Sequence, residues 1–275
     1  MIKALLLYIL LLLALIYLCI ALYLYARQRH ILYLPVKRIL SPLHHHLQGF
    51  ETVTLLTSDH LKLTAWYKKA QHPDAPTILY LHGNAGNIAD RSQKFAALTA
   101  QGMGLLALSY RGYGTSEGSP TEQGLYIDAR TALSYLRQEQ QIPLSHLILY
   151  GESLGSGVAT YLALHHSFKA MILEAPFTSI TNIAQNRYPF LPIALLLKDT
   201  FPSITRIAHI HTPLLIIHGA LDTTTPIRHG QTLYQHANHP KQLIIHPTTN
   251  HADFNPNTIA AQVEEFIEEL ENKKN

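Results

Sequence analysis

Six short apolar runs, separated by segments long enough for helices, constrain the fold of this chain more than any other feature. They occupy residues 77–83, 105–110, 147–151, 171–175, 214–219 and 242–247. Continuous apolar strands that alternate with helices are typical of a mostly parallel sheet buried on both faces. Before them, residues 50–57 and 61–69 alternate apolar and polar side chains around a turn, which predicts a β-hairpin. The sequence therefore predicts one α/β domain that begins near residue 50.

The N-terminal segment has a different character. Residues 4–26 are 23 positions without a charged side chain. A helix of this length, rising about 1.5 Å per residue, spans a hydrocarbon core of about 30 Å. We interpret residues 1–26 as a single transmembrane anchor. A cleaved secretory signal is the alternative, but the run exceeds the usual apolar core of such signals and no A-x-A-like site follows it. Cys19, the only cysteine, is expected to pack within the helix.

The charges beside this segment predict its orientation. Lys3 is the only basic side chain before it, whereas Arg27, Arg29, Lys37 and Arg38 follow it. Because basic residues tend to remain on the cytoplasmic side, we expect the bulk of the chain, which follows the anchor, to face the cytoplasm. The lack of further cysteines agrees with a compartment without disulfides. Part of the net charge of +3 belongs to these flanking residues, so it indicates a membrane surface rather than a nucleic-acid partner.

Two segments are expected to connect the regular elements. Residues 27–49 are predicted to be a juxtamembrane linker, whose run of histidines at 44–46 is expected to be solvated. A metal site is the alternative, but adjacent side chains do not converge on one ion. Residues 177–211 contain Pro189, Pro192 and Pro202, which break any long helix. We interpret this segment as a possible cap or lid, with a plain connection as the alternative.

The pattern G-x-S-x-G, which marks a nucleophilic serine when it lies on a strand-to-helix turn, occurs twice. The first copy is GTSEG at residues 114–118 and the second is GESLG at residues 151–155. Ordinary glycine and serine frequencies produce about one match by chance in ten chains of this length. The residues around each copy must therefore decide which serine is the nucleophile.

The flanks of Ser153 fit a nucleophile elbow, and those of Ser116 do not. An apolar run leads directly into the motif of Ser153, and SGVATYLALHH continues it with helix-forming residues. A helix N-terminus there directs backbone N–H groups at the oxygen where negative charge develops. RGYG separates Ser116 from the preceding strand, and the next helix is expected to start at Ser119 with a capping box that includes Glu122. We therefore expect Ser116 to lie in a structural loop.

A serine hydroxyl needs a base to remove its proton and an acid to orient that base. In α/β-hydrolases the order is serine, acid and histidine, each just after a strand. Asp222 is the only carboxylate in the loop after residues 214–219, although an Asx turn or helix cap is an alternative role. His251 follows the last apolar run, whereas the competing His246 belongs to that run. Asp222 and His251 are the candidate partners of Ser153.

An oxyanion hole should combine the N–H of Leu154 with one from the loop after residues 77–83, most simply that of Asn84. A plain turn residue is the alternative for Asn84. The sequence has no G-x-x-x-x-G-K-[ST] motif, and no G-x-G-x-x-G follows a strand. We therefore expect no cofactor and no metal.

The motifs HGNAGN, SYRGYGTSEGSP, YGESLGSG, EAPFTSI, HGALDTTTP and NHADF follow in this order from about residue 50 onward. In this set the chain resembles the α/β-hydrolase superfamily, most closely its membrane-anchored abhydrolase-domain serine hydrolases. The resemblance implies an eight-stranded, mostly parallel sheet with helices on both faces and a small cap insertion, within residues 50–275. It also implies Ser153, Asp222 and His251 as the triad. Ser109 and the pair 249–250 depart from the family pattern, which usually has aspartate and glycines there.

These residues predict a membrane-tethered serine hydrolase that cleaves carboxylic esters or thioesters through an acyl-enzyme intermediate. The tether and the apolar residues 193–199 favour acyl substrates presented by the bilayer. A peptidase or amidase with the same triad is one alternative. A non-catalytic membrane scaffold of the same fold is another, although a complete triad favours chemistry. The sequence indicates no particular protein partner.

Overall fold

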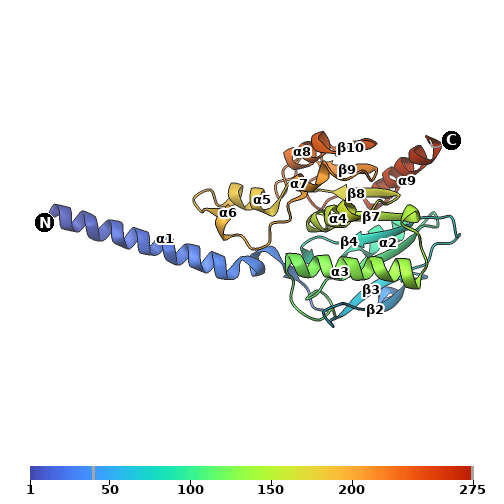
Figure 1. Cartoon of the computed structure of the whole chain (residues 1–275), viewed down its shortest axis with the longest axis horizontal. Coiled ribbons are helices and arrows are strands. Elements are labelled where there is room, and N and C mark those ends of the chain that lie inside the picture. Colours follow the sequence, from blue (N-terminus) through green and yellow to red (C-terminus); the bar gives the residue numbers. More distant parts are fainter. Residues whose placement is uncertain (39–40, 274–275) are drawn as a thin grey trace.

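The computed structural model describes residues 1–38 and 41–273, and its centre is an eight-stranded sheet (Figure 1). The strands are β2 (Glu51–Leu56), β3 (Lys62–Lys68), β4 (Thr77–Leu81), β6 (Gly104–Leu108), β7 (Leu147–Glu152), β8 (Ala170–Glu174), β9 (Leu214–Gly219) and β10 (Lys241–His246). Their spatial order is β10-β9-β8-β7-β4-β6-β3-β2. Only the pairs β2–β3 and β3–β6 are antiparallel, because the predicted hairpin adds to the edge of six parallel strands. The mostly parallel sheet expected from the apolar runs is confirmed.

Helices cover both faces of this sheet. One face carries α3 (Glu122–Ser134), α4 (Leu154–His165), α7 (Ser203–Ile207) and α8 (Arg228–His236), and the other carries α2 (Ser92–Leu98) and α9 (Pro256–Asn272). Successive strand residues point to opposite faces of the sheet. Leu149 packs in the core under α3 and α4, and Ile148 and Tyr150 pack in the core under α2 and α9. Strands buried on both sides need continuous apolar sequences, which explains the pattern read from the sequence. Short 3₁₀ helices span Pro42–His45, Ile88–Arg91 and Leu144–His146, and a π-helical turn spans Tyr135–Glu139.

The N-terminal helix α1 (Ile2–Leu32) is longer than the predicted anchor and extends away from the rest of the molecule (Figure 1). It is long and apolar enough to cross a membrane. After it, β1 (Leu34–Pro35) pairs in parallel with β5 (Ala85–Gly86) in a separate two-stranded sheet. The predicted linker is therefore helical at its start and then joins the folded domain. Residues 39–40 of that linker, and residues 274–275 at the end of the predicted hydrolase domain, lie outside the described residues.

The histidine run in this linker is only partly solvated, whereas the sequence predicts that all three side chains are solvated. His44 and His46 are exposed, but His45 is half-buried. Its ring lies 5.5 Å from that of Trp66, measured between centroids. His45 therefore helps to seat the linker on the sheet.

The segment predicted as a cap contains α5 (Ile180–Arg187) and α6 (Ile193–Leu196), which lie next to the C-terminal half of α1 (Figure 1). The prolines divide it as expected: α5 ends two residues before Pro189, and α6 starts directly after Pro192.

The predicted start of the helix after Ser116 is wrong. Helix α3 begins at Glu122, and its N-cap is Thr121 rather than Ser119. The Thr121 hydroxyl accepts a hydrogen bond from the N–H of Gly124 at 3.0 Å. This cap satisfies one of the unpaired N–H groups of the first turn, so the helix needs nothing from Ser119.

Candidate active site

Ser153 occupies a sharp turn between β7 and α4. Its φ is +49° and its ψ is −113°, a conformation that L-residues rarely adopt. Two glycines permit the close packing of this turn. A Cβ on Gly155 would lie 1.9 Å from the carbonyl oxygen of Leu81, and one on Gly151 would lie 2.7 Å from the carbonyl oxygen of Gly155. A larger residue at Gly155 would push the elbow away from β4, and one at Gly151 would push α4 away from β7.

The structure brings the three candidate catalytic side chains into one hydrogen-bonded row. The Oγ of Ser153 lies 2.9 Å from Nε2 of His251. The Nδ1 of the same imidazole lies 2.7 Å from Oδ2 of Asp222. Ser153 follows the carboxyl end of β7, Asp222 follows that of β9, and His251 follows that of β10. These strands are parallel, so the three loops meet at one edge of the sheet. This is the arrangement in which a histidine can accept the serine proton while a carboxylate fixes its orientation.

Asp222 is buried and ionised. Its Oδ1 accepts hydrogen bonds from the N–H groups of Thr224 and Thr225, both at 2.8 Å. Burial raises the pKa of this carboxyl, but hydrogen bonds from His218 and His251 outweigh the effect and hold the pKa well below its ordinary value. The carboxylate is therefore present throughout the neutral range. The Asx-turn role and the acid role are compatible, because Oδ1 serves the turn and Oδ2 faces His251.

Two further side chains around Asp222 were not foreseen from the sequence. The hydroxyl of Thr225 donates to Oδ2 of Asp222 at 2.8 Å and lies 3.0 Å from Nδ1 of His251. On the other side, Nε2 of His218 lies 3.4 Å from the same carboxylate oxygen and 2.7 Å from the carbonyl oxygen of Thr225. The threonine run at residues 223–225 could have pointed to Thr225, because a hydroxyl group close to a carboxylate can donate a hydrogen bond to it.

The histidine loop is held despite lacking the glycines of the family pattern. The side-chain oxygen of Asn250 accepts from the N–H of His251 at 2.8 Å and from that of Thr223 at 3.3 Å. The carbonyl oxygen of Thr249 accepts from the N–H of Leu221 at 3.1 Å. These bonds join the histidine loop to the acid loop.

Leu154 and Asn84 lie beside Ser153, where the oxyanion hole was predicted. All three line a small cavity of about 90 Å³. Leu154 is the first residue of α4, so its N–H has no acceptor within its own helix. Asn84 is held from three sides. Its carbonyl oxygen accepts from the N–H of Leu34 at 2.9 Å and from the hydroxyl of Tyr113 at 2.7 Å, and its side-chain amide donates to the carbonyl oxygen of Leu32 at 2.9 Å.

A buried charge network supports the elbow from below. Glu152 precedes the serine and pairs with Arg91, whose Nη2 lies 2.7 Å from its Oε1. Lys94 pairs with Glu174 at the end of the neighbouring strand, at 2.7 Å. Burial raises the pKa of Glu152, but the charges of Arg91 and Lys94 outweigh it and hold the pKa well below its ordinary value. The network fixes the ends of β7 and β8 under the candidate nucleophile.

Ser116 lies in a loop that the structure uses for support. Its buried hydroxyl donates to the carbonyl oxygen of Ser109 at 2.7 Å and accepts from the N–H of Thr64 at 2.9 Å. Ser109, which replaces the usual aspartate of the family, donates to the carbonyl oxygen of Tyr113 at 3.1 Å. The Ser116 hydroxyl therefore ties the loop to β3 of the hairpin, and the Ser109 hydroxyl braces the loop internally.

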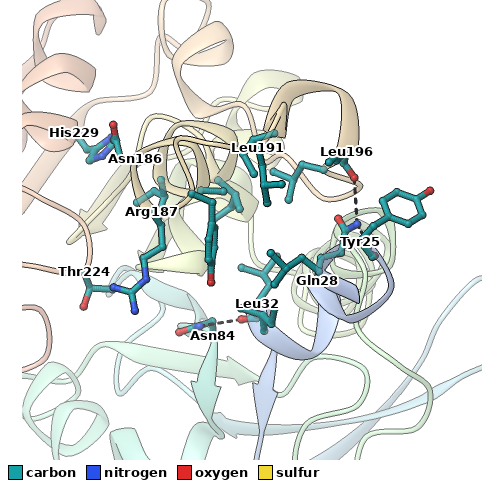
Figure 2. A pocket seen from close by; sticks show the side chains of 18 of the residues that line it. Tyr25, Gln28, Leu32, Asn84, Asn186, Arg187, Leu191, Leu196, Thr224 and His229 are labelled. Atoms are coloured by element: carbon teal, nitrogen blue, oxygen red, sulfur yellow. Dashed lines mark hydrogen bonds between the residues drawn. The ribbon is translucent and has the colours of Figure 1, made fainter. Parts of the chain in front are cut away.

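A larger cavity of about 710 Å³ adjoins the small one and shares lining residues with it. Figure 2 shows this larger cavity. It is lined mainly by leucine, isoleucine, alanine and tyrosine side chains from α1 and the cap, and its lining also includes Arg187, Arg228 and two threonines. No aspartate or glutamate lines it in the part of the chain that the structure describes. Within residues 1–38 and 41–273, no group of three or more His, Cys, Asp or Glu side chains is arranged to hold a metal ion.

Comparison with known proteins agrees with this architecture. Residues 71–206 match the family model of the serine aminopeptidases, S33. The chain is 34% identical over 235 residues to the uncharacterized protein Rv2307c of Mycobacterium tuberculosis, covering 85% of this chain and 84% of that one. It is 40% identical over 147 residues to the alpha/beta hydrolase domain-containing protein WAV2 of Arabidopsis thaliana, covering 52% of this chain and 47% of that one.

Solved structures share the fold at low sequence identity. The Pyrococcus furiosus esterase Pf2001 superimposes with a TM-score of 0.69 at 18% identity, over 87% of this chain and 98% of the esterase. An alpha-beta hydrolase from Vibrio vulnificus superimposes with a TM-score of 0.67 at 21% identity, over 86% of this chain and 96% of that one. The chain belongs to the α/β-hydrolase superfamily, as the order of its motifs predicted.

Proposed function

We propose that this chain is a membrane-anchored serine hydrolase that cleaves carboxylic esters or thioesters through Ser153, His251 and Asp222. The observation that carries the proposal is the continuous hydrogen-bonded row from Ser153 Oγ to the Asp222 carboxylate, with distances of 2.9 and 2.7 Å. His251 takes the serine proton as Oγ attacks the carbonyl carbon, and then gives that proton to the leaving group. Water, activated by the same histidine, releases the acyl group from the serine.

The N–H groups of Leu154 and Asn84 are the proposed donors to the oxyanion. The N-terminal end of α4 adds its positive dipole at the same point. The hydrogen bonds that fix Asn84 to α1, β1 and Tyr113 keep its backbone rigid, which is what a preorganised oxyanion hole requires.

The lining of the large cavity favours an acyl ester over a peptide with a free amino terminus. A buried ammonium group needs a carboxylate partner, and the described lining of the cavity contains two arginines and no acidic side chain. Apolar walls suit an acyl chain instead. The peptidase alternative is retained because the matching family model is named for serine aminopeptidases.

A substrate panel tests this function. The full-length chain in phosphatidylcholine nanodiscs would be assayed with p-nitrophenyl esters of graded length, an acyl thioester and an aminoacyl p-nitroanilide. We expect turnover of the esters and thioester that disappears in Ser153→Ala and persists in Ser116→Ala. Turnover of the anilide alone would favour the peptidase, and no turnover of any substrate would favour the scaffold.

We also propose that residues 1–26 anchor the protein and that the catalytic domain faces the cytoplasm. The apolar length of α1 and the basic residues that follow it support both statements. The protein should stay with membranes through carbonate washing, and protease added to intact cells should spare residues 50–275. Release by carbonate would contradict the anchor, and digestion from outside would reverse the orientation.

A further inference from the structure

One stripe of α1 faces the large cavity. The helix contributes residues at positions 21, 24, 25, 28, 31 and 32 to the lining. These intervals of three and four residues place them on the same side of a helix. Figure 2 shows Gln28 and Leu32 of α1 facing Leu191 of the cap across the cavity. The helix is therefore a wall of the cavity as well as a candidate anchor.

The cap is fastened along this part of α1 by polar contacts. The hydroxyl of Tyr17 donates to the carbonyl oxygen of Phe190 at 3.0 Å. Gln28 donates from its side-chain amide to the carbonyl oxygen of Leu196 at 3.2 Å and accepts from the N–H of Lys198 at 2.7 Å.

A charged contact adds to these bonds near the end of the helix. Arg29 pairs with the buried carboxylate of Asp199 at 2.8 Å. The cap thus follows α1 from residue 17 to residue 29, and the cavity lies between the two.

The upper part of the cavity lies at the level of the apolar run. Ala21, Leu24 and Tyr25 belong to the uncharged residues 4–26, and all three line the cavity. At the tip of the cap, Phe190 is 56% exposed and Leu195 is 85% exposed. Apolar side chains with this exposure suit contact with lipid rather than water. The side of the cavity formed by Ala21, Leu24 and Tyr25 would therefore face the hydrocarbon side of the interface.

The large cavity continues to the candidate nucleophile. It shares five lining residues with the small cavity that contains Ser153: Leu32, Asn84, Ile180, Ile183 and Thr224. The path from the bilayer to the serine is thus lined by α1 on one side and α5 on the other. Figure 2 shows Arg187 beside Thr224, on the side of the cavity away from Tyr25, and this polar side suits a polar leaving group.

We propose that the acyl chain of a bilayer lipid ester enters laterally between α1 and the cap, and that α1 forms one wall of the acyl-binding site. This inference rests on the proposed function and names its substrate class. The ester carbonyl reaches Ser153 while the chain remains against Leu24 and the apolar residues of α5 and α6. The leaving group then departs toward Arg187 and Thr224.

A matched pair of substitutions tests the wall. Leu24 lines the cavity, whereas Leu22 is 58% exposed and lies about 200° away around the helix. In phosphatidylcholine nanodiscs, Leu24→Trp should lower the ratio of kcat/KM for p-nitrophenyl dodecanoate to that for the butyrate by about tenfold or more. Burying one methylene of the acyl chain raises kcat/KM by about fourfold, so a tryptophan that excludes two methylenes accounts for the tenfold decrease. Leu22→Trp should leave the ratio within about twofold.

The outcomes separate this inference from the function on which it rests. If wild-type protein cleaves neither ester, the proposed function fails. If it cleaves both and the two tryptophan variants give the same ratio, only the role of α1 fails.

A second measurement needs no variant in the helix. An alkyl fluorophosphonate with a diazirine at the end of a long chain would be attached to the wild-type enzyme in the same nanodiscs and irradiated. We expect crosslinks to the peptide that contains residues 21–32 and to the cap. Crosslinks confined to α8 or to the acid loop would overturn the proposal.

Discussion

The carboxyl edge of the sheet and the roof of the cavity are built in different ways. We call α1 together with the cap helices α5 and α6 the roof. At the edge, Ser153, Asp222 and His251 each follow a strand by a few residues, so the parallel sheet itself brings them together. The roof joins α1 to a cap about 170 residues later in the chain, through bonds such as Gln28 to Leu196. Under the proposed function, the sheet edge would carry out the chemistry, and α1 with the cap would select the substrate.

The two regions meet at Asn84. Its side chain bonds the last carbonyl of α1, its carbonyl oxygen bonds the start of β1, and its own N–H is the proposed oxyanion donor. A fragment that begins at residue 50 would lack both α1 and β1. Assays of the full chain are therefore the appropriate tests of activity.

The largest expected effect belongs to the sheet edge. His251→Ala should lower kcat by on the order of 10⁴-fold, because the serine then has no base. Combining it with Ser153→Ala should add little, since the residues act as one unit. Steady-state kinetics with a short ester measures both. If the double variant lost the product of the two single factors, the residues would act independently and the triad would be wrong.

The edge was predictable from sequence and the roof was not. Ser153, Asp222 and His251 could be selected from the sequence because each lies in a loop directly after an apolar strand. In a parallel sheet such loops lie at the same edge, so their residues come close together. Helix α1 is apolar on every side, so its periodicity does not reveal which stripe faces the cap. Its pairing of Arg29 with Asp199 also depends on a sequence separation that no local pattern encodes. The missed N-cap at Thr121 is a boundary error between two adequate capping residues.

A smaller effect on kcat is expected from Thr225, whose hydroxyl contacts both Asp222 and His251. Thr225→Val removes the hydroxyl shared by Asp222 and His251, and should lower kcat by about 10- to 100-fold, the range for one hydrogen bond to a charged group. Thr115→Val is the control, because its hydroxyl pairs with Thr64 at an exposed position. Equal losses in the two variants would remove Thr225 from the site.

The smallest effect tests the junction of the two regions. Asn84→Ala removes the bond to the carbonyl oxygen of Leu32 and should lower kcat for short and long esters alike by about three- to tenfold. Asn238→Ala loses two similar bonds, to Ala208 and Ile210, far from Ser153 and should leave kcat unchanged at matched stability. A loss confined to long-chain esters would show that Asn84 serves only the roof.

The most direct measurement labels the full chain with a fluorophosphonate probe and locates the adduct by mass spectrometry. The probe reacts with a serine only where a base activates it and an oxyanion hole receives the charge. Both serines lie in G-x-S-x-G, but only Ser153 lies within hydrogen-bonding distance of His251, and Ser116 is bonded to Ser109 and Thr64. We expect the adduct on Ser153 alone, lost in Ser153→Ala and retained in Ser116→Ala. An adduct on Ser116 in protein that still unfolds cooperatively would contradict the account.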